Sequence, residues 1–120
     1  MKKPIAIIAG EPNSISSEII FKSWKSKKKF RRNRFFIIGS INLLNLQKKK
    51  LNYKIKIKEI NKNFKIEDLN STELPVFNVD YHQDKPFEKI SKKSNKYIFN
   101  CFKIALNFFK NKKILGIINC

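Results

Sequence analysis

Short continuous apolar runs, each followed by a helical pattern, constrain the fold of this chain most strongly. The first run is Ile5-Ala6-Ile7-Ile8-Ala9, between Pro4 and Gly10, and the second is Phe35-Phe36-Ile37-Ile38, before Gly39. An unbroken apolar run of this length between turn residues is typical of a strand buried on both faces of a parallel sheet. We therefore predict an α/β fold, with alternating β-α units forming a mainly parallel sheet that has helices on both faces.

Two helices are predicted after these strands. Asn13 or Ser14 can accept hydrogen bonds from the first free backbone N–H groups of the first helix. Its apolar residues recur at helical spacing and are Ile15, Ile19, Ile20, Phe21 and Trp24. Gly39-Ser40 forms the turn and cap of a second helix, which carries Ile41, Leu43, Leu44 and Leu46. The lysines within residues 25–29 and 48–50 then lie at the ends of the two helices, where cations complement the helix dipole.

The rest of the chain continues this alternation. Lys54–Lys58 alternates strictly between lysine and isoleucine, which predicts an edge strand with one solvent-exposed face. Residues 59–72 are a connection, Leu74–Val79 is a strand with Pro75 near its start, and residues 80–86 are a loop. The apolar residues of Ser94–Lys110 form two stripes, Ile98-Phe102-Ala105-Phe109 and Cys101-Ile104-Phe108, so this helix needs cover on two sides. Lys113–Asn119 is an apolar last strand, expected to be buried.

The length of the chain bounds its domain organisation. With 120 residues, 42% of them hydrophobic, the chain can build one packed core. In open parallel sheets each strand normally leads into a helix, and ligands bind at the carboxyl ends of the strands. The last strand ends at Cys120 without a following helix. We therefore expect residues 1–120 to be an incomplete N-terminal α/β part of a larger two-domain protein.

The charge of the chain raises nucleic acid as a partner. The sequence has 27 Lys and Arg against 9 Asp and Glu, a formal net charge of +18, which attracts polyanions at low salt. The run Lys25–Arg34 could neutralise several phosphates. However, only Arg31, Arg32 and Arg34 are arginines, and no zinc-finger, RNP or helix-turn-helix pattern is found. The lysine excess matches the bias of AT-rich codons, so we predict no nucleic-acid partner and keep a basic nucleic-acid-binding module as an alternative.

Metal and membrane signals are weak. Cys101, Cys120 and His82 have no metal-ligand spacing, so we expect no metal ligand in this chain, with Cys101 a core residue and His82 solvated. The apolar run before Gly10 is shorter than the roughly 7–15 residues of a secretory signal. No stretch approaches the roughly 20 apolar residues that span a membrane. We therefore expect a cytoplasmic protein without a membrane partner.

The loop between the first strand and first helix is the best candidate site, because a helix N-terminus is receptive to phosphate or carboxylate. With its flanks it resembles the opening of the 4-hydroxythreonine-4-phosphate dehydrogenase family, Gly-Asp-Pro-Ala-Gly-Ile-Gly-Pro-Glu. The matching residues are Gly10, Pro12, Ile15 and Glu18, with Glu11 in place of the aspartate. The residues that differ are Asn13, Ser14, Ser16 and Ser17. Glu18 is expected to cap the first helical turn, where a carboxylate suits the helix dipole, rather than to contact a ligand.

Two further segments are similar to the same family in the same order. Phe36-Ile37-Ile38-Gly39-Ser40, with Leu43-Leu44, resembles its second strand and helix. Gly116-Ile117-Ile118-Asn119-Cys120 resembles a later strand that the family writes Ala-Leu-Val-Thr-Ala. The resemblance runs from Pro4 to Cys120 and covers the N-terminal portion of a family member.

The resemblance implies an enzyme of pyridoxal 5'-phosphate biosynthesis. It oxidises and decarboxylates a small phosphorylated amino acid, 4-phosphooxy-L-threonine, to 3-amino-2-oxopropyl phosphate with NAD (or NADP), and it acts as a homodimer. A divalent metal such as zinc, magnesium or cobalt polarises the alcohol and then the carbonyl. The family's metal and main substrate residues lie beyond Cys120, so we expect no catalytic residue here and an inactive chain. Gly10 and Glu11 are the candidate cofactor-binding residues lining the cleft, unless they only shape the turn.

A second alternative is a complete, non-enzymatic α/β domain. It would pair with itself or with another protein through the apolar helix at residues 94–110. In the dehydrogenase interpretation, the remainder of the enzyme and the dimer mate cover that helix instead.

Overall fold

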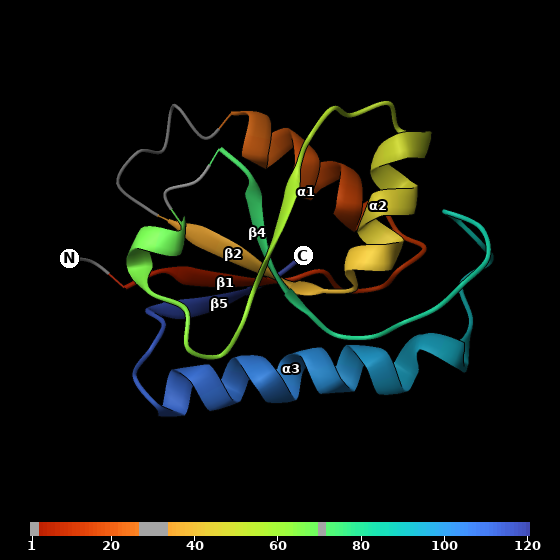
Figure 1. Ribbon diagram of the computed structural model, residues 1–120. Helices are drawn as coiled ribbons and strands as arrows, with labels where there is room; N and C mark the ends of the chain where they lie inside the picture. Colours follow the sequence, from red (N-terminus) through yellow and green to blue (C-terminus); the bar gives the residue numbers. More distant parts are fainter. Residues whose placement is uncertain (1–2, 27–33, 70–71) are drawn as a thin grey trace.

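The computed structural model describes residues 3–26, 34–69 and 72–120, and these form one five-stranded sheet with the order β3-β4-β2-β1-β5 (Figure 1). Every neighbouring pair of strands is parallel, which confirms the predicted α/β class. The elements are β1 (Ile5–Ile8), α1 (Ser16–Lys25), β2 (Phe35–Gly39), α2 (Ile41–Lys50), β3 (Ile57–Ile60), β4 (Leu74–Asn78), α3 (Asn95–Lys110) and β5 (Gly116–Asn119), with short 3-10 helices η2 (Ile66–Leu69) and η3 (Lys92–Ser94).

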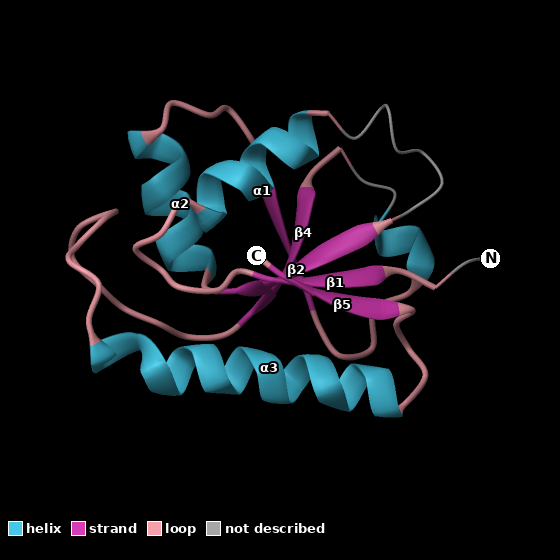
Figure 2. Ribbon diagram, turned by 180° about the vertical axis from the view of Figure 1, so that it is seen from behind, coloured by secondary structure: helices cyan, strands magenta, loops and turns pink. Residues whose placement is uncertain are grey.

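The sheet separates two hydrophobic cores. Helices α1 and α2 cover one face and α3 covers the other, as Figures 1 and 2 show from opposite sides. Because side chains alternate along a strand, Ile37 of β2 packs in the core under α1 and α2, whereas Phe36 and Ile38 pack in the core with α3. All three side chains are fully buried, which confirms β2 as a strand covered on both faces.

The strands on the β5 side are covered less than predicted. In β1, Ala6 and Ile8 are fully buried against α3, but Ile5 and Ile7 are only half-buried. β5 is an edge strand paired with β1, and its Ile118 is 49% exposed. The prediction of a buried last strand is therefore wrong, because no residue of β5 is buried, although α3 packs against the strand.

The lysine-rich strand lies at the predicted edge but begins later. β3 starts at Ile57, which pairs with Leu74 of β4, instead of at Lys54. Ile55 is buried in the core with α1 and α2 before the strand begins, so the first half of the alternating segment serves helix packing. β4 forms where predicted, and its pairing with β2 begins at Val76, just after Pro75.

Helix α3 forms as predicted but is covered on one side only. Its buried stripe is Tyr97, Cys101, Ala105 and Phe108. Phe109, expected in a second buried stripe, is 52% exposed, and Phe99 is 65% exposed on the outer face. Within the described residues, no helix is both long and apolar enough to cross a membrane.

Candidate functional site

The candidate loop lies at the carboxyl edge of the sheet, between β1 and α1. In an open parallel sheet this edge is where ligands bind. The long segment that joins β4 to η3 runs along the same edge, next to α2 (Figure 1). The site is therefore built from two loops, residues 9–15 and 79–91, and from the N-terminal ends of α1, α2 and α3.

Gly10 brings the first loop against the end of β5. Its φ is +76°, a conformation that favours glycine, and a Cβ at this position would collide with the backbone oxygen of Cys120. Cys120 N donates a hydrogen bond to Ile8 O (3.1 Å), and Ser16 Oγ donates one to Cys120 O (3.1 Å). Gly10 is therefore needed for the close approach of two backbone segments, and this requirement holds whether or not a ligand binds there.

Glu11 is half-buried and held from both sides. Its Oε1 accepts a hydrogen bond from Asn13 N (3.2 Å), and its Oε2 accepts one from Ser94 Oγ (3.2 Å). Ser14 Oγ donates to the Glu11 carbonyl oxygen (2.9 Å). The carboxylate thus links its own loop to the start of α3 and keeps a fixed position at the carboxyl edge.

The N-cap residue of α1 is Ile15, and no side chain caps this helix, so neither Asn13 nor Ser14 is the cap that the sequence predicted. Ser14 Oγ accepts a hydrogen bond from Ser16 N (3.1 Å), while the Asn13 side chain points to the second loop. Glu18 lies in the first turn as predicted, but it makes an exposed ion pair with Lys22 (3.4 Å) and no capping hydrogen bond.

Buried amides join the two loops. Gln83 Nε2 donates to Asn13 Oδ1 (2.8 Å), and Gln47 Nε2 donates to Pro12 O (2.6 Å) and to Pro86 O (3.0 Å). Gln47 is 1% exposed and Gln83 is 3% exposed. Neither residue was predicted from the sequence. Gln47 did carry a signal, because its spacing from the apolar residues of α2 places it on the buried face of that helix.

Ser40 caps α2 as predicted. Its Oγ accepts from Leu43 N (3.2 Å) and donates to Tyr81 O (3.0 Å), and its N–H donates to Tyr97 Oη (2.9 Å). Burial raises the pKa of Tyr97 and raises the pKa of Cys101 to about 11, so both side chains stay protonated at neutral pH. Cys101 is a core residue, as expected, and not an activated nucleophile.

A small hollow lies beneath the loop, bounded by Gly10, Glu11, Ser17, Gln47 and Tyr97 among others. Its volume of about 10 Å³ is at the lower limit for a single water molecule. Ser17 Oγ is buried here and has no hydrogen-bond partner among the described residues. A dinucleotide or a phosphorylated substrate does not fit inside this hollow, so contact with the loop would be made on its outer side.

The described residues bring together no group of three or more His, Cys, Asp or Glu side chains that could hold a metal. His82 is exposed, as expected, and its Nε2 lies 3.3 Å from Oδ1 of the equally exposed Asp84. Of the basic run Lys25–Arg34, on which the nucleic-acid alternative depends, residues 27–33 lie outside the described residues.

Comparison with known proteins gives matches at the level of structure. No known family profile matches the chain, and no curated protein matches its sequence. A 4-hydroxythreonine-4-phosphate dehydrogenase from Burkholderia phymatum is 20% identical with a TM-score of 0.78, and the match covers 99% of this chain and 36% of that one. A chain from Salmonella typhimurium, provisionally assigned the same activity, is 19% identical with a TM-score of 0.80, over 99% and 37% of the two chains.

These matches confirm the predicted resemblance at the level of the fold. The chain has the fold of part of these larger dehydrogenases, and it spans little more than a third of their length.

Proposed function

We propose that residues 1–120 supply the N-terminal part of a dehydrogenase that converts 4-phosphooxy-L-threonine to 3-amino-2-oxopropyl phosphate. The agreement between two observations supports this proposal above all. The loop that carries Gly10, Pro12, Ile15 and Glu18 was matched to this family by its residues alone, and the whole fold independently resembles solved structures of dehydrogenases with that activity. The complete enzyme in this proposal is a cytoplasmic homodimer without nucleic-acid or membrane partners.

In this proposal Gly10 and Glu11 line the cofactor cleft. A dinucleotide held there, NAD or NADP, would supply the hydride acceptor for oxidation of the substrate alcohol. Gly10 sets the path of the loop, and Glu11 presents a carboxylate whose position is fixed by Asn13 and Ser94. The net charge of +18 attracts a phosphorylated substrate and a dinucleotide alike. The described residues bring together no group that could hold a metal. In this proposal the metal ligands are those that the family resemblance places beyond Cys120.

The first test measures activity of the chain alone. The purified 120-residue protein is incubated with phosphohydroxythreonine, NAD and, in turn, zinc, magnesium or cobalt, and NADH formation is followed by absorbance. We expect no activity above the blank, because the described residues bring together no metal-ligand group and the proposal places the metal and main substrate residues beyond Cys120. The Burkholderia phymatum dehydrogenase is the positive control. NADH formation by the chain would contradict the proposal that the catalytic groups lie elsewhere.

The second test concerns the loop itself. The segment Gly10–Glu18 replaces the corresponding loop of the intact Burkholderia phymatum enzyme, with and without Glu11→Ala. If the loop lines the cleft, Glu11→Ala changes KM for NAD or for the substrate several-fold in this graft. The melting temperature of each graft separates a binding effect from a loss of folding. Unchanged KM and kcat for both substrates would assign Glu11 to the shape of the turn alone.

A further inference from the structure

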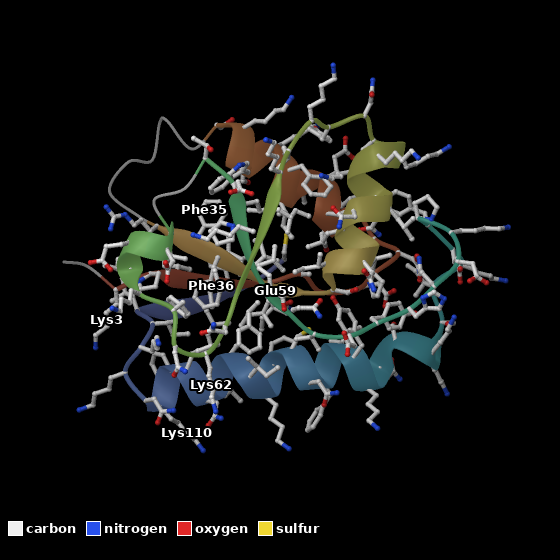
Figure 3. The ribbon with its side chains drawn as sticks, viewed as in Figure 1. Lys3, Phe35, Phe36, Glu59, Lys62 and Lys110 are labelled. Carbon is white, nitrogen blue, oxygen red and sulfur yellow. The ribbon has the colours of Figure 1, made fainter. Side chains whose placement is uncertain are left out.

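A second pocket lies on the other side of the sheet, away from the candidate site. It has a volume of about 350 Å³, within the range of small-molecule sites, and it opens between the C-terminal half of α3 and the segment that follows β3. Figure 3 labels Lys62 of that segment, which lines the pocket together with Asn107 of α3. None of the residues that build the carboxyl-edge loops lines it. A ligand here therefore does not depend on the proposed dehydrogenase function.

The inner wall of the pocket is apolar and firmly held. It consists of Phe77, Ile104 and Phe108. The rings of Phe77 and Phe108 pack edge to face with centroids 5.4 Å apart, and Phe108 packs in the same way against Phe36 on its other side at 5.6 Å. Aromatic pairs in this geometry are stable without a ligand. The wall thus offers a preformed apolar surface to a flat or branched group.

The rim of the pocket is positively charged. Lys62 and Lys113 line it, and no Asp or Glu does. Lys113 Nζ donates a hydrogen bond to Lys62 O (2.8 Å) and lies 4.5 Å from the centroid of the Phe64 ring, which fixes its position at the rim. Neither lysine makes an ion pair within the described part of the chain. An ammonium group carries three donors, so Lys113 keeps hydrogen-bonding capacity for a ligand.

Two side-chain amides complete the rim. Asn107 and Asn111 are four residues apart at the end of α3, so they lie on the same face of the helix and both line the pocket. Both side chains are exposed at the rim. Their N–H groups can donate to the oxygens of an anion that the lysines attract.

We infer that this pocket binds a small organic anion with a flat apolar body, such as an aromatic carboxylate, sulfonate or phosphate. The body packs against Phe77, Ile104 and Phe108, and the anionic group lies at the rim with Lys62 and Lys113. The ligand needs both its apolar body and its anionic group to bind. An organic cation is repelled by the rim, and an inorganic anion has nothing to place on the aromatic wall.

The test is an NMR titration of the full 120-residue chain with phenyl phosphate at physiological ionic strength, where long-range attraction by the net charge is screened. We expect saturable shifts of the Asn107 and Asn111 side-chain amides. Inorganic phosphate and phenethylamine, each of which lacks one half of the ligand, should bind at least about tenfold more weakly. Shifts that do not saturate, or that are strongest in the loop at Gly10–Ser17, would overturn the inference.

Matched variants separate this site from the general charge of the protein. Lys62→Gln removes a charge at the rim, and Lys96→Gln removes one from an exposed position at the start of α3. We expect the first to weaken phenyl phosphate binding several-fold and the second to leave it unchanged. Equal effects would mean that only the overall field attracts the ligand. Asn107→Phe, at an exposed helical position, fills the pocket and should abolish the saturable shifts. The backbone spectrum should be retained, which shows that the variant still folds. Saturable binding that survives in this variant would contradict the site.

Discussion

Ser16 and Ser17 are neighbouring residues at the start of α1 with opposite hydrogen-bonding states. Ser16 Oγ donates to Cys120 O (3.1 Å), whereas the buried Ser17 Oγ has no partner among the described residues. A buried polar group without a partner costs about 1–3 kcal/mol of stability. We therefore expect Ser17→Ala to raise the free energy of unfolding by about 1 kcal/mol. The measurement is urea denaturation of the 120-residue chain.

Ser16→Ala is the matched control for this prediction. It removes the hydrogen bond to Cys120 and should lower the free energy of unfolding by about 1 kcal/mol. The opposite signs of the two substitutions are the diagnostic result. If Ser17→Ala destabilises the protein instead, a water molecule in the hollow beneath the loop must satisfy the hydroxyl.

Cys101 makes stability depend on pH in the alkaline range. Burial raises the pKa of its thiol from 9.0 to about 11, so the folded protein holds this proton more tightly than the unfolded chain does. The associated stabilisation is complete below about pH 9 and is lost as the pH rises through about 11. We expect the free energy of unfolding to fall by about 1–3 kcal/mol over this range.

The control is Cys101→Ala, measured by denaturation at several pH values. The variant should show a shallower decline between pH 9 and 11. Burial also raises the pKa values of Tyr97, Tyr81 and Cys120, and these groups contribute to the part of the decline that remains. Identical pH profiles for the two proteins would show that the Cys101 thiol does not ionise differently on folding.

At the scale of single elements, α3 has one face that is packed and one that is exposed. Ala105 is fully buried against the sheet, whereas Phe99 and Leu106 are 65% and 52% exposed. We expect Ala105→Leu to cost about 1–3 kcal/mol by overpacking. Phe99→Gln and Leu106→Gln should each change stability by less than about 0.5 kcal/mol. Chemical denaturation checks all three variants, and a large loss at Phe99 would mean that this face is covered in solution.

An element was predicted well where its sequence pattern reflects strand or helix formation alone, and less well where the same residues also pack elsewhere. β2 and the Ser40 cap were correctly placed, because an unbroken apolar run ends at a glycine and is followed directly by a capping serine. β3 was placed too early, because Ile55 continues the alternating pattern but packs under the helices. The last strand was predicted to be buried but lies at the edge of the sheet. Its place depends on the strand order, which cannot be read from the apolar runs.

The candidate site shows the same division. The position of the loop and the hydrogen bond from Ser16 N to Ser14 Oγ followed from local sequence, since both involve residues close together in the chain, although the N-cap itself is Ile15. The contact between Asn13 and Gln83 joins residues 70 positions apart, so it could not be predicted from a local sequence pattern. Glu11 was correctly placed in the loop, but its link to Ser94 depends on where α3 begins in space.

For the whole molecule, charge is the dominant property. The net charge of +18 makes the compact state repel itself. The ion pairs between described residues, such as Glu18 with Lys22, have exposed side chains and contribute little. We therefore expect stability to rise when salt screens the repulsion, with a higher urea midpoint at 0.5 M than at about 0.02 M sodium chloride. A midpoint that falls with added salt would show that attractive pairs outweigh the repulsion.

The strand order also fixes the sequence of events in folding. β1 lies between β2 and β5, and its Ile5 pairs with Gly116. One hydrogen-bonding edge of β1 therefore stays open until nearly the whole described chain has left the ribosome. Pairing over such a separation is slow, because a long loop must close first. During that interval the unpaired edge of an apolar strand is free to pair with other nascent chains, which makes β5 a protective element as well as a structural one.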